Sequence, residues 1–99
     1  VYRETWETGA IVLRVSPSWV RFGTFEYFAH KQKHAELESL ADYAIAESYP
    51  HLMDEANKYL LFFTEVVGKT ARLMAEWQAV GFQHGVMNTD NMSIHGLTI

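Results

Sequence analysis

The pattern of apolar and polar positions predicts a helix over 35–48. Its apolar side chains recur at i, i+3, i+4, i+7 and i+8 from Leu37 to Ile45, and acidic residues occupy the opposite face. Pro50 ends this segment, because a proline disfavours helical geometry in the residue before it. We therefore expect a short amphipathic helix whose acidic face meets solvent.

A second, longer helix is predicted over 58–80. Apolar and aromatic residues form one stripe from Tyr59 to Trp77, and the charged side chains lie mostly outside it. Gly81 follows where a left-handed C-terminal cap is expected, and Phe82 would then fold back onto the helix. Aromatic residues at this spacing indicate core packing rather than a ligand-binding box.

The first part of the chain combines a strand pattern with an aromatic-rich one. Residues 9–15 are rich in β-branched residues and predict a strand. Arg14 then lies on a strand face that is otherwise apolar, either as an edge residue that reaches water or as a residue with a polar partner. Residues 19–30 carry several aromatic side chains at partly helical spacing, interrupted by Gly23.

Two serines compete as the N-cap of that aromatic helix. Ser16 would place Pro17 at the first helical position, and Ser18 is the alternative. At the other end of the chain, 92–94 and 97–99 read as two short strands hinged at Gly96. The predicted fold class is mainly α (α+β), with one N-terminal strand, about three helices and a short C-terminal hairpin. We interpret 1–99 as a single unit with a strand region (1–15), a helical region (16–82) and a loop with hairpin (83–99).

Composition narrows the class of protein. A chain of 99 residues fits one small domain, and its 48% apolar content either closes on itself or needs a neighbour, so self-association is expected. The net charge of −4 argues against a nucleic-acid partner, and the lack of cysteine excludes a disulfide framework. No apolar run reaches the length of a membrane span. Because the chain begins at Val1 and stops at Ile99 inside a predicted strand, we interpret it as a piece of a longer protein.

The polar loop over 84–94 carries the candidate chemistry. A long helix, a capping glycine and then His84 followed seven residues later by Asn91 is the layout of a protein-kinase catalytic loop, in which the asparagine binds a nucleotide-bound magnesium ion. The kinase pattern requires an aspartate two residues after the histidine, where this chain has Val86, so Asp90 is the only carboxylate available. The alternative is an Asx-rich turn in which Asn88, Asp90 and Asn91 only cap backbone N–H groups.

A zinc site is the other metal hypothesis that the sequence raises. His30 and His34 are spaced i, i+4, as in a metal pair on one helix face. No third ligand is indicated nearby and the intervening residues are basic, so the pattern favours a surface pair.

Two stretches together resemble one known family. Residues 15–28 (VSPSWVRFGTFEYF) and 77–94 (WQAVGFQHGVMNTDNMSI) closely resemble the selenoprotein O family, also called YdiU, and the likeness spans nearly the whole chain. The resemblance implies a protein-kinase-like fold, with this chain covering the hinge and the catalytic-loop part of the large lobe. It also implies transfer of AMP from ATP to Ser, Thr or Tyr hydroxyls of proteins, with Mg²⁺ or Mn²⁺.

The resemblance assigns roles to four residues of this chain. Asp90 corresponds to the proton acceptor, Asn91 to a metal ligand, and Arg14 and Arg21 to arginines that contact the nucleotide. Arginine suits this task because its planar fork of donors matches phosphate oxygens. Two rival functions stay open: transfer of UMP with manganese, and a non-catalytic helical interaction module.

The resemblance also implies what the chain lacks. The family's second metal-binding aspartate would follow Ile99, and the glycine-rich loop and lysine of the N-terminal lobe would precede Val1. We therefore expect the 99-residue chain alone to be inactive. The resemblance implies a cytoplasmic location in bacteria and a mitochondrial one in eukaryotic relatives.

Overall fold

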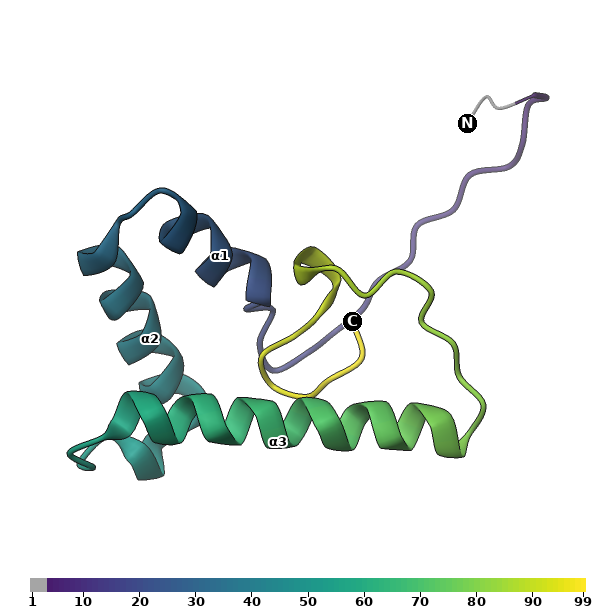
Figure 1. Ribbon diagram of the computed structural model, residues 1–99. Helices are drawn as coiled ribbons and strands as arrows, with labels where there is room; N and C mark the ends of the chain where they lie inside the picture. Colours follow the sequence, from purple (N-terminus) through teal and green to yellow (C-terminus); the bar gives the residue numbers. More distant parts are fainter. Residues whose placement is uncertain (1–3) are drawn as a thin grey trace.

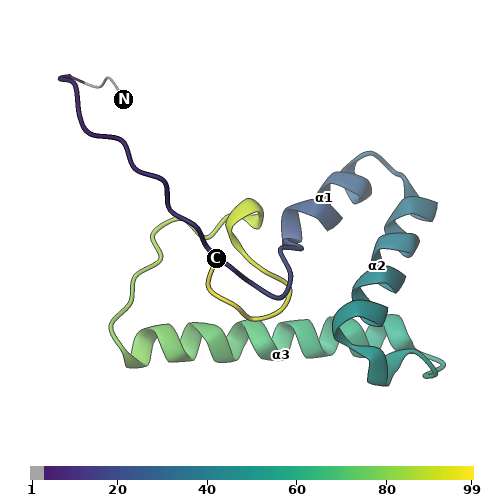
Figure 2. The same cartoon turned by 180° about the vertical axis from the view of Figure 1, so that it is seen from behind.

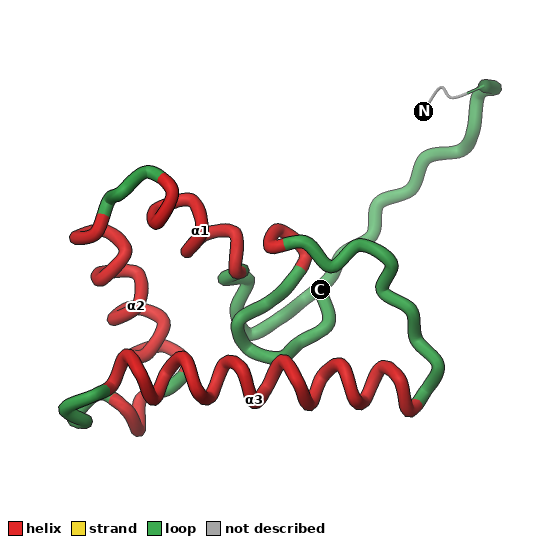
Figure 3. Tube along the Cα trace, in the orientation of Figure 1, coloured by secondary structure: helices red, strands yellow, loops and turns green. Residues whose placement is uncertain are grey.

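The computed structural model describes residues 4–99, and its regular secondary structure is helical throughout that range (Figures 1 and 3). The first three residues of the predicted N-terminal region lie outside the described part. In chain order the elements are α1 (Phe22–His30), α2 (His34–Ser48), the 3₁₀ turn η1 (Pro50–Leu52), α3 (Lys58–Ala79) and the 3₁₀ turn η2 (Thr89–Asn91). The mainly helical prediction is confirmed, and no described helix combines the length and apolarity needed to cross a membrane.

The three helices surround the C-terminal segment. In Figures 1 and 2, α1 begins beside η2 and leads away from it to α2. α2 then ends near the beginning of α3, which forms the long side of the molecule. α1 contacts both α2 and η2, while η1 packs between α2 and α3. The two predicted amphipathic helices are therefore confirmed, and the η2 part of the loop contacts α1 while residues 85–90 stay exposed.

The main core forms around Tyr49, at the end of α2. Its side chain is fully buried, its ring meets Phe62 edge-on at 5.3 Å between centroids, and its hydroxyl donates a 2.9 Å hydrogen bond to the Ile94 carbonyl. The ammonium of Lys69 lies 4.1 Å from the centre of the same ring. Burial raises the pKa of Tyr49, because desolvation disfavours the phenolate. Ile94, also buried, joins this core to the C-terminal segment.

The C-terminal end of α3 has the predicted glycine cap. Gly81 adopts φ +72, its N–H donates to the Gln78 carbonyl at 3.2 Å, and the Phe82 N–H donates to the Trp77 carbonyl at 2.8 Å. These two bonds define a Schellman motif. The Phe82 ring packs on Trp77 with 5.5 Å between centroids, as the sequence predicts. The cap ends α3 and turns the chain toward the loop.

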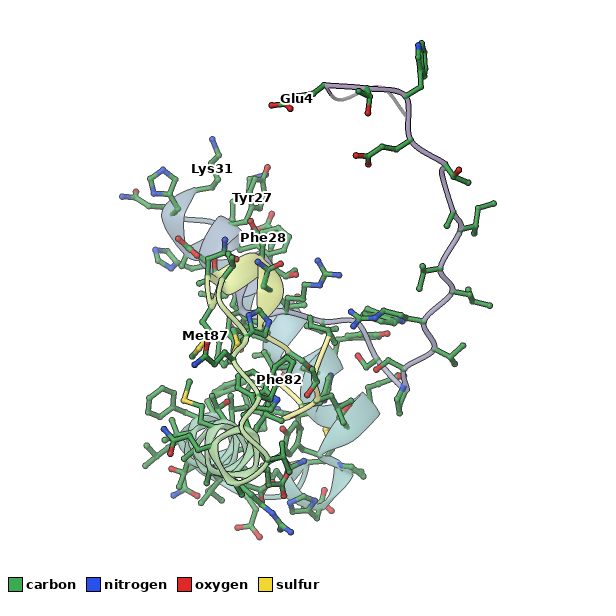
Figure 4. All side chains as sticks on the ribbon, turned by 90° about the vertical axis from the view of Figure 1, so that its right-hand side faces the viewer. Glu4, Tyr27, Phe28, Lys31, Phe82 and Met87 are labelled. Carbon is green, nitrogen blue, oxygen red and sulfur yellow. The ribbon has the colours of Figure 1, made fainter. Side chains whose placement is uncertain are left out.

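The predicted N-terminal strand is wrong. Residues 9–15 are extended but belong to no sheet, and Figures 1 and 4 show this arm leading away from the helices with its side chains in the open. Ile11 is 99% exposed. A strand requires a partner for its backbone N–H and C=O groups, and within residues 4–99 none lies beside this segment.

The predicted C-terminal hairpin is also wrong, although its turn exists. Gly96 has φ +69, but the segments on either side of it do not pair with each other. Ser93 instead forms an antiparallel bridge with Arg21. Residues 97–99 contact α3 instead, where the Trp77 indole N–H donates to the Thr98 hydroxyl at 2.9 Å. Burial of the C-terminal segment between helices outweighs the local hairpin.

The start of α1 differs from both predicted caps. Ser16 and Ser18 lie in a turn before the helix, where the Ser16 hydroxyl donates to the Ser18 carbonyl at 2.9 Å. The N-cap position belongs to Arg21, whose side chain makes no capping bond. The helix begins at Phe22 because the preceding residues are held extended by the bridge to Ser93.

The contact between α2 and α3 predicts a specific alkaline response. The Tyr59 hydroxyl donates to Asp42 at 2.8 Å, and this bond raises the pKa of Tyr59 to about 12. The folded state then keeps a proton that the unfolded state loses from pH 10 upward, so this contribution to stability is present below pH 10 and lost toward pH 12. We expect unfolding curves of the wild type and Tyr59→Phe to converge over that interval. A difference that stays constant with pH would contradict the assignment.

Candidate functional site

The η2 turn places Asp90 and Asn91 side by side and fixes the asparagine. The Asn91 N–H donates to the Asn88 carbonyl at 3.0 Å, and its side-chain amide donates to the Val86 carbonyl at 3.2 Å. The side-chain carbonyl oxygen of Asn91 accepts no hydrogen bond from the residues that the structure describes. Asn91 thus uses its donors to hold the loop and leaves an oxygen available for a cation.

This geometry differs from the Asx-cap alternative. Asn88 precedes η2 without any side-chain capping bond. Asn91 donates through its side chain to a carbonyl, whereas a cap would accept from a backbone N–H. The two asparagines therefore do not hold the turn in the way that alternative predicts.

His84 supports the other side of the loop. Its ring packs on Trp77 at 5.3 Å between centroids, and its Nδ1 atom accepts the Val86 N–H at 3.3 Å. The carbonyl of the same Val86 holds Asn91. Val86 thus contributes to the loop through its backbone, and the residue is 57% exposed. The loop is braced against the end of α3.

Arg21 joins the beginning of α1 to the loop. Its Nη1 atom donates to the Asp90 carbonyl at 3.0 Å, across 69 residues of sequence. Two backbone bonds flank this contact, from Phe22 N–H to the Met92 carbonyl at 3.0 Å and from Ile94 N–H to the Val20 carbonyl at 3.3 Å. No other hydrogen bond of the Arg21 guanidinium reaches a residue within 4–99, so donors remain for an anionic ligand.

Gly23, in the first turn of α1, allows the Asp90 carboxylate to approach the helix backbone. A Cβ atom at position 23 would lie 2.5 Å from Asp90 Oδ1 and 3.4 Å from the Thr89 carbonyl oxygen. The carboxylate therefore occupies the space of a missing side chain near a helix N-terminus, where backbone partial charges favour an anion. The sequence signal for this contact is a glycine that interrupts an otherwise helical pattern.

The structure does not bring Arg14 to the other three predicted residues. Arg14 lies on the exposed N-terminal arm and helps to line a hollow of about 300 Å³. The other lining residues include Trp19 and the C-terminal pair Leu97 and Thr98. No hydrogen bond or ion pair links Arg14 to Arg21, Asp90 or Asn91 within the described range. Three of the four predicted residues thus form one cluster, and Arg14 belongs to a neighbouring hollow.

The described residues fit a hard cation only in part. The free carbonyl oxygen of Asn91 and the adjacent Asp90 carboxylate are oxygen donors of the kind that Mg²⁺ accepts. Residues 4–99 contain no group of three or more His, Asp or Glu side chains placed to hold a metal ion. His30 and His34, the other sequence candidates, therefore form no such site here. A cation at Asn91 would need further ligands from phosphates, water or other residues.

The close approach at Gly23 predicts the effect of a matched pair of substitutions. Gly23→Ala forces the Asp90 carboxylate to rotate away, because the added Cβ meets its flexible end. Gly68→Ala, in α3, meets nothing within 4 Å and is the control. We expect the carboxyl ¹³C resonance of Asp90 to move in Gly23→Ala only, with stability changed by less than about 1 kcal/mol. An unmoved resonance in both variants would disprove the contact.

Comparison with known proteins gives the same family. The sequence model of a family described as "Protein adenylyltransferase SelO" matches residues 1–99. Relatives described as "Protein nucleotidyltransferase YdiU" are similar over the whole chain: 58% identical in Myxococcus xanthus (strain DK1622), 61% in Thioalkalivibrio sulfidiphilus (strain HL-EbGR7) and 57% in Klebsiella pneumoniae (strain 342). The chain covers 20%, 20% and 21% of these relatives, about a fifth of their length. The chain belongs to the SelO/YdiU family of nucleotidyltransferases.

Proposed function

We propose that this chain is a segment of a protein adenylyltransferase that transfers AMP from ATP to Ser, Thr or Tyr hydroxyls of proteins. The observation that carries the proposal is the junction of α1 with η2. It joins Arg21 to Asp90 across 69 residues and sets both beside Asn91, whose carbonyl oxygen is free. The family description names adenylyl transfer, which favours AMP over UMP.

The proposed reaction assigns one task to each residue of the cluster and one to Arg14. The acceptor hydroxyl oxygen forms a bond to the α-phosphorus of ATP, the bond to the departing pyrophosphate breaks, and the hydroxyl proton passes to the Asp90 carboxylate. The free donors of Arg21 neutralise phosphate oxygens, and Arg14 approaches the nucleotide from the N-terminal arm. Asn91 would hold a Mg²⁺ or Mn²⁺ ion, which supplies further neutralisation of phosphate charge.

The proposal includes the architecture around the segment. We infer that the full-length protein has a protein-kinase-like fold, in which 83–99 form the catalytic loop and the arm before α1 forms part of the hinge. Two features support this: the loop is braced by a histidine at its start, and Asn91 lies seven residues after that histidine. Residues outside the chain would supply the rest of the nucleotide site.

Asp90→Ala in the full-length protein tests the proposed base. We expect transfer of labelled AMP to a protein substrate to fall by about 10²- to 10⁴-fold, because the hydroxyl then loses its proton acceptor. Asp54→Ala is the control, since Asp54 is an exposed carboxylate in the turn after η1. Undiminished transfer by Asp90→Ala would contradict the assignment of the base.

The isolated 99-residue chain provides a second test. It holds Arg21, Asp90 and Asn91 but, by the family likeness, lacks the remaining phosphate and metal ligands. We expect no micromolar binding of ATP in a calorimetric titration with Mg²⁺, whereas the full-length protein binds. Tight, Mg²⁺-dependent binding by the short chain would show that the described residues form a complete nucleotide site.

A further inference from the structure

A hollow of about 260 Å³ lies between α1 and η2, and Asp90 forms part of its wall. Its other lining residues come from one face of α1 and from the residue before Asp90: Gly23, Glu26, Tyr27, His30 and Thr89. Arg14, Arg21 and Asn91, the proposed nucleotide and metal ligands, are absent from this lining. The hollow thus reaches the proposed base from a side that carries none of the groups for phosphate.

The size of the hollow suits one amino-acid side chain with its adjoining backbone. Pockets for drug-sized ligands measure roughly 300–1,000 Å³, above the volume found here. Tyr27 gives the wall an aromatic surface, and its ring is oriented by an edge-on contact with Phe28 at 5.3 Å between centroids. Figure 4 shows both residues on the part of the molecule remote from α3. Glu26, Tyr27 and Asp90 are all exposed, so within residues 4–99 the hollow is open to an incoming polypeptide.

Apart from the His30 imidazole, the ionisable groups that line the hollow are acidic. Glu26 and Asp90 both carry carboxylates, and no lysine or arginine lines the hollow. The Glu26 side chain makes no hydrogen bond or ion pair with any other residue of the described range. An unpaired carboxylate one helix turn from Gly23, and so beside the proposed base, attracts a positively charged group on whatever enters.

We propose that this hollow binds the acceptor segment of the protein substrate, with its hydroxyl directed at Asp90. Glu26 determines specificity, because it favours acceptors that carry Lys or Arg next to the modified residue. This inference rests on the proposed AMP transfer. The hydroxyl enters from α1, its oxygen bonds to the α-phosphorus, pyrophosphate leaves, and the proton goes to Asp90.

Two synthetic peptides test the proposal on the full-length protein. They are identical except for the residue after a single serine, which is Lys in one and Glu in the other. We expect the wild type to bind the Lys peptide more tightly by about two- to fivefold, as for an exposed ion pair. Fluorescence anisotropy measures the Kd, and transfer of labelled AMP gives kcat/KM for each peptide.

Charge reversal at Glu26 identifies the residue responsible. Glu26→Lys should reverse the order of the two peptides in both assays and leave the KM for ATP unchanged. Glu26→Gln should abolish the preference for the Lys peptide. This variant replaces Glu26→Lys as the test if Glu26→Lys does not fold. Glu36→Lys is the matched control, because Glu36 is an exposed acid in the first turn of α2 and lies outside the hollow. We expect it to retain the wild-type preference.

The outcomes separate this inference from the proposed function. Equal treatment of both peptides by the wild type, or an unchanged preference in both Glu26 variants, would overturn the acceptor site even if AMP is transferred normally. Failure to bind either peptide would overturn the acceptor site as well. Binding with the expected charge preference but no nucleotide transfer would support the hollow as a peptide site and refute the proposed reaction.

Discussion

The burial of Met92, Ser93 and Ile94 is the constraint on which the rest of the structure depends. These three residues are at most 6% exposed, and they are held by backbone bonds to the segment before α1 and by the Tyr49 hydroxyl. A buried carbonyl such as that of Ile94 is costly to leave unpaired, so the segment has one acceptable position. Because Asp90 and Asn91 directly precede it, that position also fixes the candidate site.

The same arrangement places different chemical groups on the two sides of Asp90, as the proposed reaction requires. The extended residues before α1 contribute Arg21, whose remaining donors suit phosphate oxygens, while the first turns of α1 contribute Gly23 and Glu26 on the other side of Asp90. The carboxylate thus lies between a face rich in donors and a face without cations. Such a separation suits a reaction that joins an anionic nucleotide to a hydroxyl on a second molecule.

The sequence predicts those features whose causes are local. The stripe from Tyr59 to Trp77 and the glycine at 81 specify α3 and its cap, because helix periodicity and φ > 0 depend on neighbouring residues. The spacing of His84 and Asn91 also located the polar loop after this cap, while the role of Asn91 stays a prediction. The strand at 9–15 and the terminal hairpin were predicted wrongly, because pairing depends on distant partners that β-propensity does not reveal. The contact of Gly23 with Asp90 has the same long-range origin.

The link between Arg21 and Asp90 has a consequence for the order of folding. The two residues are 69 positions apart. Forming this contact therefore closes a long loop, which costs chain entropy. Helices α1, α2 and α3 form from local contacts, whereas the site exists only after the chain has returned to α1. During synthesis from the N-terminus, Arg21 and Gly23 emerge long before their partner. The site is thus among the last parts of this segment to assemble and among the first to be lost when the C-terminal segment detaches.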